Sequence, residues 1–248
     1  FGKAIIEFPA VSEMLSLMKA KLDASRSLLY ETTRFVDMYK TLEDISKERK
    51  LEKEERDEMK RYQKQADAFT PMSKGMGSEF CNQNAYDCVQ IHGGSGFMKD
   101  YACERIYRDA RITSIYEGTT QLQVVAAIRH VTTGTYLNMM RYYEEQEVSG
   151  DLQTLRTRLK ELTSIYAETV EQVTATKDND YIDFQARRMV EMAGHIIMSH
   201  LLILDTERND SFRTSAEVYV RYAEAEVRKN AAFIASFDIN DMTYYRRN

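Results

Sequence analysis

Two short segments carry residue types from which a binding or catalytic site could be built. The first is Gln90-Ile91-His92-Gly93-Gly94. With Gly96 just beyond it, three of the chain's ten glycines lie within four positions. Glycine adopts positive φ angles and admits close approach, so such a segment can direct backbone N–H groups at phosphate oxygens. A simple corner between two helices is the alternative interpretation.

The second segment is Glu117-Gly118-Thr119-Thr120-Gln121, where a carboxylate and a glycine precede a predicted helix start. A carboxylate held in a fixed position can remove a proton from a weak carbon acid, provided that the substrate is aligned with it. Partial desolvation strengthens a carboxylate as a base. Without further context, however, a glutamate in such a turn is most often an exposed surface residue.

The cysteines and histidines do not predict a metal site. Cys81, Cys88 and Cys103 are odd in number and lack metal-type spacing, and the four histidines are scattered. We therefore expect reduced, partly buried thiols and assign no metal.

Helical periodicity predicts the elements that must position these segments. Apolar residues recur at alternating three- and four-residue steps after Pro9, which predicts a long amphipathic helix over residues 10–40. Residues 43–64 carry eight acidic and eight basic side chains. They predict a charged, solvated helix or a mobile excursion, with partner binding as the alternative. Pro71 indicates a new helix start, and helical spacing continues through residues 72–89.

The second half of the chain predicts further helices. One is expected from Thr119 to about His130, with the hydroxyl of Thr119 or Thr120 as its cap. The polar run over residues 144–150 indicates a connector. Beyond it, three apolar stripes separated by polar turns predict an antiparallel helical extension, with helices over residues 152–173, 182–204 and 218–234.

Composition excludes several classes of protein. The net charge of -5 and the pI near 5.6 argue against nucleic acid as the main partner. No apolar run reaches the roughly 18 to 20 residues that span a bilayer, and no signal-peptide pattern opens the chain. With two prolines in 248 residues, the chain favours long helices. Because its first residue is Phe1, we expect a piece of a longer protein.

Three linked motifs resemble the C-terminal signatures of the acyl-CoA dehydrogenases in order and spacing. They occupy residues 89–97, 108–112 and 115–123. The resemblance implies an all-α chain with an antiparallel up-and-down helical bundle, the family's C-terminal four-helix domain, over residues 1–140. Residues 150–248 resemble an additional helical extension that only some members carry. The family's N-terminal helical domain and middle β domain would be absent from this chain.

The resemblance also implies an activity and the residues that perform it. Members of the family are FAD enzymes that remove two hydrogens from an acyl-CoA thioester. Glu117 matches the base that removes the Cα proton, and Gly118 matches a substrate contact. Phe1 matches a position near the flavin. The matches to FAD contacts are Thr119 and Gln121, together with Gln90, Ile91, His92, Gly93 and Gly94, which approach the FAD diphosphate across a dimer interface.

The partners and compartment follow from the same resemblance. It implies a homo-oligomer, either a dimer or a tetramer, with electron-transfer flavoprotein as the electron acceptor. A bacterial cytoplasm or a mitochondrial matrix fits, and secretion does not. We expect this chain alone to be inactive. Two alternatives stay open: a helical assembly module with an incomplete flavin site, and an oxidase-like relative that passes electrons to oxygen.

Overall fold

The fold is organised around a long antiparallel hairpin of two helices, α1 (Pro9–Glu48) and α2 (Lys53–His92). The computed structural model describes residues 2–245, and every regular element in that range is helical. The prediction of an all-α chain is therefore confirmed. Phe1, which was expected near the flavin, lies outside the described residues.

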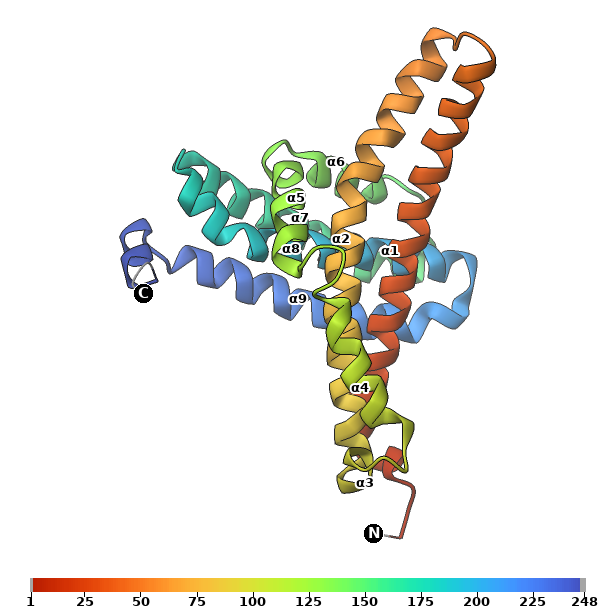
Figure 1. Cartoon of the computed structure of the whole chain (residues 1–248), viewed down its shortest axis with the longest axis vertical. Helices are drawn as coiled ribbons and strands as arrows, with labels where there is room; N and C mark the ends of the chain where they lie inside the picture. Colours follow the sequence, from red (N-terminus) through yellow and green to blue (C-terminus); the bar gives the residue numbers. More distant parts are fainter. Residues whose placement is uncertain (1, 246–248) are drawn as a thin grey trace.

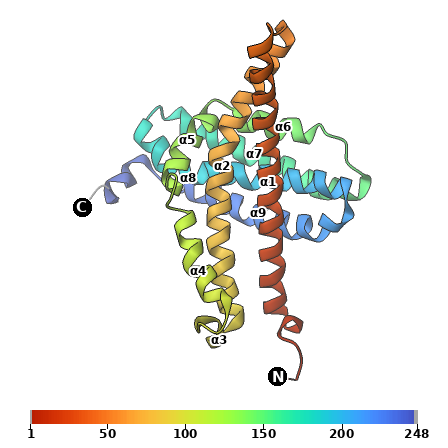
Figure 2. The same ribbon diagram turned by 45° about the vertical axis from the view of Figure 1, so that its right-hand side comes forward.

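Three further helices form a layer across this hairpin, as Figures 1 and 2 show from two directions. They are α7 (Gln153–Ala175), α8 (Asn179–Arg208) and α9 (Arg213–Ala235). All three agree with the predicted extension. The shorter elements are α3 (Gly94–Phe97), α4 (Ala102–Thr113), α5 (Thr120–Thr132) and α6 (Thr135–Glu144), and the 3-10 helices η1 (Ile5–Glu7), η2 (Gly150–Leu152), η3 (Asp210–Phe212) and η4 (Ile239–Tyr244).

The charged stretch over residues 43–64 forms the tip of the hairpin, which projects beyond the crossing layer (Figure 1). Its turn is held by Arg49, whose guanidinium donates to the two carboxylate oxygens of Glu55 at 2.8 and 2.5 Å. Leu51 is buried in the same turn. The stretch is thus a charged helix in two halves, in agreement with the first of the two predicted forms.

The expectation that Pro71 begins a new helix is wrong, because α2 continues through it from Lys53 to His92. A proline inside a helix removes one backbone hydrogen bond and costs about 3 kcal/mol relative to alanine. Buried side chains on both sides of the proline, Phe69 and Met72, keep the same face of α2 in the core. This continuous packing maintains the helix across the proline.

Helix α8 lies at the centre of the molecule. Residues 192–203 are buried all around its circumference, which is the pattern of a helix enclosed on every side. It packs against α1, α5, α6, α7 and α9. The extension therefore shares one core with the hairpin. Within the described residues, no helix combines the length and apolar character needed to cross a bilayer.

Polar contacts also join the hairpin to the crossing layer. The buried carboxylate of Asp23 on α1 accepts a hydrogen bond from the hydroxyl of Ser215 on α9 at 2.6 Å. Ser27, one turn further along α1, donates to the carboxylate of Asp205 on α8 at 2.6 Å. Because buried polar atoms are costly to leave unpaired, these contacts fix the angle at which the layers cross.

Candidate functional site

The Glu117–Gly118 turn joins α4 to α5, and both helices run antiparallel to α2. Both residues have positive φ angles, 52° for Glu117 and 93° for Gly118. A non-glycine residue in this region is uncommon, costs on the order of 1–3 kcal/mol, and is found preferentially at functional sites. Glycine suits position 118 because of this φ angle, and a Cβ there would also displace the amide of Gln123, whose Nε2 would lie 2.8 Å away.

Two side chains hold this turn in place. Lys74 on α2 donates from Nζ to the carbonyl oxygen of Gly118 at 2.6 Å. Gln123 on α5 donates from Nε2 to the carbonyl oxygens of Glu117 and Gly118, both at 3.3 Å. The backbone that carries Glu117 is therefore fixed to both the hairpin and α5, although the Glu117 side chain is exposed in this chain.

The first turn of α5 follows directly. Thr119 is the N-cap, as expected, and its hydroxyl accepts a hydrogen bond from the backbone N–H of Leu122 at 3.3 Å. The hydroxyl of Thr120 is buried and donates to Oε1 of Glu79 on α2 at 2.6 Å. The first turn of α5 is thus capped by Thr119 and hydrogen-bonded through Thr120 to the hairpin helix α2.

Thr119 and Gln121 line a cleft of about 370 Å³ beside this turn. The cleft also contains two arginines, Arg111 on α4 and Arg187 on α8. In the first turn of α5, the N–H groups of Thr120 and Leu122 already donate to the carbonyl oxygen of Ser114 and the hydroxyl of Thr119. The helix dipole and the two arginines are therefore the features that favour an anionic ligand here. The remaining lining residues are Glu79, Asn82, Ser114, Ile115 and Thr120.

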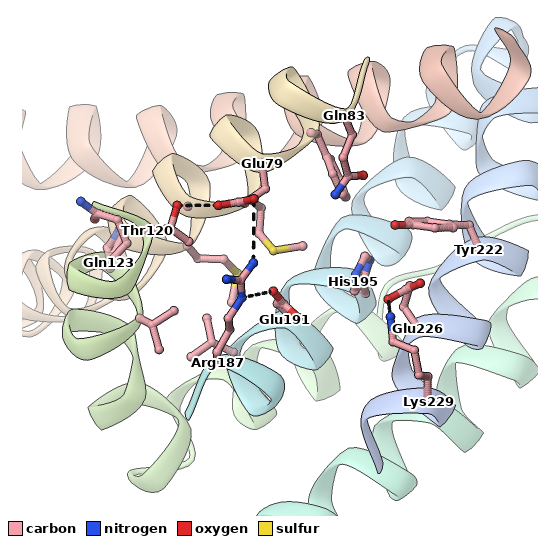
Figure 3. A pocket seen from close by; sticks show the side chains of 17 residues that line it. Glu79, Gln83, Thr120, Gln123, Arg187, Glu191, His195, Tyr222, Glu226 and Lys229 are labelled. Carbon is pink, nitrogen blue, oxygen red and sulfur yellow. Dashed lines mark hydrogen bonds and ion pairs between the residues drawn. The ribbon is translucent and has the colours of Figure 1, made fainter. Parts of the chain in front are cut away.

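Arg187 and Glu79 are site residues that sequence reasoning missed. Nη2 of Arg187 lies 3.8 Å from Oε2 of Glu79, and its Nε donates to Oε1 of Glu191 at 2.7 Å. The hydrogen bond to Glu191 raises the pKa of the guanidinium, and the nearby charge of Glu79 raises it further. Figure 3 shows the resulting chain of contacts from Thr120 through Glu79 to α8.

A second cavity, of about 270 Å³, lies behind the turn between α2, α5, α8 and α9 (Figure 3). Its inner wall includes His195, whose Nδ1 lies 3.1 Å from the hydroxyl of Tyr219. Desolvation lowers the pKa of His195 to about 3, so its imidazole is neutral at physiological pH. The side chains of Glu226 and Lys229 in the same cavity pair with each other. The charged side chains that line this cavity are therefore paired, and its histidine is neutral.

The glycine segment lies at the far end of α2, where Gly93 ends the helix with φ 61° and ψ -145°. Only glycine adopts this conformation readily. A Cβ at Gly93 or Gly94 would meet no atom within 4 Å, so the outer side of the corner is open to a ligand or another chain. The side chains of Gln90 and His92 are exposed, and Ile91 is half-buried.

The predicted residues therefore fall into two groups. Glu117, Gly118, Thr119 and Gln121 gather around one turn, whereas residues 90–94 lie beyond the opposite end of α4. A helix of 12 residues such as α4 spans about 18 Å at 1.5 Å per residue. The predicted site residues of one chain thus lie in two separate places.

Both parts suit a dinucleotide flavin. The cleft beside α5 lies at a helix N-terminus and contains two arginines, and the corner at residues 93–94 leaves room for backbone approach to a phosphate group. The exposed Glu117 borders the same turn as the cleft residue Thr119. The residues of both groups therefore fit FAD, and the Glu117 carboxylate lies in the turn beside the cleft.

Comparison with known proteins places this geometry in a family. The model of the acyl-CoA dehydrogenase C-terminal domain matches residues 1–132, more than half of the chain, and a second model, acyl-CoA dehydrogenase C terminal, matches residues 132–242. The chain is 36% identical to caffeyl-CoA reductase-Etf complex subunit CarC of Acetobacterium woodii over 123 residues, which are 50% of this chain and 26% of that protein.

Two further matches extend into α7–α9. The 3-methylmercaptopropionyl-CoA dehydrogenase of Ruegeria pomeroyi is 31% identical over 189 residues, covering 71% of this chain and 29% of that protein. An acyl-CoA dehydrogenase of Bacillus anthracis, crystallised with FAD, has the same fold, with a TM-score of 0.70 and 23% identity over 99% of this chain and 45% of that chain. The chain thus spans between a quarter and a third of the length of these two curated relatives. It belongs to the acyl-CoA dehydrogenase family and corresponds to its C-terminal region.

Proposed function

We propose that this chain supplies the catalytic base and part of the flavin site of an FAD-dependent acyl-CoA dehydrogenase. The observation that carries the proposal is the Glu117–Gly118 turn, where a carboxylate stands at positive φ immediately before a helix N-terminus. Nothing in the packing of this chain requires a glutamate there, since its side chain is exposed. A strained backbone that carries an exposed carboxylate is typical of a functional residue.

In the proposed reaction, Glu117 removes the proton from Cα of the acyl-CoA thioester. FAD, when bound, accepts the hydride that leaves Cβ. Gly118 leaves space for the thioester beside the carboxylate, and Lys74 and Gln123 hold the turn so that Glu117 keeps its alignment. Because Glu117 is exposed here, the bound substrate and the rest of the protein must supply the desolvation that strengthens it as a base.

The two separate groups of FAD contacts support a homo-oligomer. Thr119 and Gln121 would contact the flavin bound by their own subunit, while residues 90–94 would reach the FAD diphosphate in a second subunit. Exposed apolar side chains on α3, α4 and α5 support such an assembly, because surfaces of this kind commonly mark interfaces. They include Phe97, Ile106, Ile112, Leu122 and Val125. Electron-transfer flavoprotein is the proposed acceptor, since the name of one relative includes an Etf complex.

The test of the base is the Glu117→Gln variant of the full-length protein. The amide keeps the shape of the side chain, so folding and FAD binding are expected to survive. Reduction of the flavin by acyl-CoA, followed by absorbance after anaerobic mixing, should slow on the order of 10²- to 10⁴-fold. Glu117→Asp should be intermediate, because the shorter side chain keeps the charge and loses the alignment.

Glu147→Gln is the matched control, since it removes another exposed carboxylate from the connector after α6. Reduction of the Glu117→Gln flavin within a few-fold of the wild-type rate would remove Glu117 from this role. A full-length protein without FAD would favour a helical assembly module instead. Fast reoxidation of the substrate-reduced flavin by air would favour an oxidase. The isolated chain is expected to bind FAD weakly and to self-associate.

A further inference from the structure

Three potential metal ligands meet at the corner between α2 and α4. Cys88 and His92 are four residues apart on one face of α2, and the turn through α3 brings Cys103 of α4 against them. One ligand atom from each residue lies within 4.8 Å of the other two. Their spacing in the sequence matches no familiar metal motif and predicted no metal site, and it is the fold that brings these residues together.

The distances suit a small tetrahedral site. Zinc bonds of about 2.3 Å to sulfur and 2.0–2.1 Å to nitrogen place neighbouring ligand atoms roughly 3.6–3.8 Å apart in a tetrahedron. Sγ of Cys88 lies 3.9 Å from Nδ1 of His92. Cys103 is buried, and its thiol donates a weak hydrogen bond to the carbonyl oxygen of Gly96 at 3.4 Å. Small changes in side-chain rotamer would complete the geometry.

We propose that Cys88, His92 and Cys103 bind a thiophilic divalent cation of the Zn²⁺ type. Two thiolates and one imidazole are the ligands that such ions prefer, and the set leaves a fourth position for water. That position faces solvent, because His92 is exposed and Cys88 is only half-buried. Binding displaces one proton from each thiol, and these protons pass to the solvent.

His92 has to rearrange for this role. Its Nδ1 now lies 2.8 Å from the carbonyl oxygen of Cys88, so the ring N–H donates to the backbone. The ring is exposed, with the ring of Tyr101 as a tilted neighbour at 5.9 Å, and it can turn away from the carbonyl to direct a nitrogen lone pair at the metal. The exposed ring of His92 can therefore move to meet a metal ion held by the buried Cys103.

A bound ion would link the last turn of α2 to α4 across the glycine corner. The loop that it closes contains Gly93, Gly94 and Gly96, so the ion would restrict the segment with the greatest backbone freedom in the chain. His92 also belongs to the segment proposed to approach the FAD diphosphate, but that approach uses the backbone, whereas the metal would be bound by side chains of α2 and α4. A measurement of metal binding therefore tests this proposal separately from the proposed function.

The experiment uses the full-length protein, stripped of metal and kept reduced with a phosphine. Titration with Co²⁺ should saturate at one equivalent per chain and produce the thiolate-to-cobalt charge-transfer absorption together with the strong d–d bands of a four-coordinate ion. Zn²⁺ should then displace the Co²⁺. Cys88→Ser and His92→Gln should each weaken Zn²⁺ binding by at least 10- to 100-fold, the loss seen when only a supporting residue of a metal site is removed.

Cys81→Ser is the control, because Cys81 is an exposed thiol that lies outside the cluster. It should retain full metal binding. A second measurement avoids the variants altogether: Zn²⁺ should slow alkylation of Cys88 by iodoacetamide and leave the rate at Cys81 unchanged. The proposal is overturned if the wild-type protein gives no charge-transfer band, or if Cys88→Ser and His92→Gln bind Zn²⁺ as tightly as Cys81→Ser does.

Discussion

The hydroxyl of Thr120 donates a 2.6 Å hydrogen bond to the carboxylate of Glu79, and this contact ties the first turn of α5 to α2. Oε2 of Glu79 also lies 3.8 Å from Nη2 of Arg187 on α8, so the same carboxylate contacts both α5 and the helical extension. Glu117 lies three positions before Thr120. Helix α8 is therefore linked to the turn of the proposed base through the side chains of Arg187, Glu79 and Thr120.

Thr120→Val is expected to slow flavin reduction in the full-length protein without loss of FAD. Valine keeps the shape of threonine and removes the hydrogen bond, which is worth about 1.5–3 kcal/mol when its acceptor is charged. Thr132→Val, at the exposed end of the same helix, is the control. Equal rates of flavin reduction in the two variants would show that the Thr120–Glu79 contact does not position the base.

Arg187→Met is expected to have a smaller effect in the same assay. The Arg187–Glu79 pair is partly exposed and 3.8 Å long, and such pairs contribute about 0–1 kcal/mol, which corresponds to at most roughly a fivefold change in rate. Arg208→Met removes a more exposed arginine at the end of α8, paired with Asp205, and serves as the control. A slower rate in Arg208→Met than in Arg187→Met would contradict the proposed link.

Two buried histidines on α8 are expected to make the chain unstable to acid. Burial lowers the pKa of His195 and His200 to about 3, with smaller contributions from Lys229 and Lys21 near His195 and from Arg156 near His200. The unfolded chain binds these protons near pH 6.5, so the stabilisation is complete above that pH and is lost progressively as the pH falls towards 3. Each histidine should account for roughly 2 kcal/mol of the free energy of unfolding lost between pH 7 and pH 5.

Urea unfolding of the 248-residue chain at the two pH values measures this loss. His200→Gln should reduce the difference by about half, because one of the two linked protonations is gone. His92→Gln, which replaces an exposed imidazole, should leave the difference unchanged. Equal unfolding free energies at pH 5 and pH 7 in the wild-type chain would rule out the linkage.

Two glycine-to-alanine substitutions are expected to change stability in opposite directions. A Cβ at Gly96 would lie 2.7 Å from the backbone oxygen of Val89 and from Cβ of His92, so Gly96→Ala must displace α3 and should cost about 1–3 kcal/mol. A Cβ at Gly77, inside α2, would meet no atom within 4 Å. Gly77→Ala should therefore stabilise the chain by about 0.5–1 kcal/mol. Thermal unfolding of both variants is the measurement, and effects of the same sign would contradict the stated contacts.

Local sequence patterns predicted most of the helices. The stripes of α1, α7, α8 and α9 repeat at three- and four-residue steps, and Thr119 caps α5 as its hydroxyl and position suggested. The prediction of a helix start at Pro71 was wrong because the rule for proline concerns the backbone alone, while the packing of Phe69 and Met72 extends across the proline. Local rules fail where tertiary packing outweighs them.

The site was predictable only where its residues are adjacent in sequence. Glu117, Gly118 and Thr119 form one continuous segment, so the resemblance could identify them together. Arg187 reaches the same cleft from α8, and no local pattern connects two segments so far apart in the chain. The Cys88–His92 pair had an i, i+4 spacing that could have been noticed, but the approach of Cys103 depends on the path of α3 and α4.

The crossing of the two layers also sets the order in which the chain can fold during synthesis. The hairpin helices are joined by a turn of only a few residues, so they can pair as soon as α2 has been made. Ser27 and its partner Asp205 are 178 positions apart, a delay of roughly 10–35 seconds at 5–20 residues per second. Until α8 arrives, the apolar face of the hairpin stays exposed. A ribosome that stalls in this interval would hold the chain in the state that aggregates most readily and that chaperones bind best.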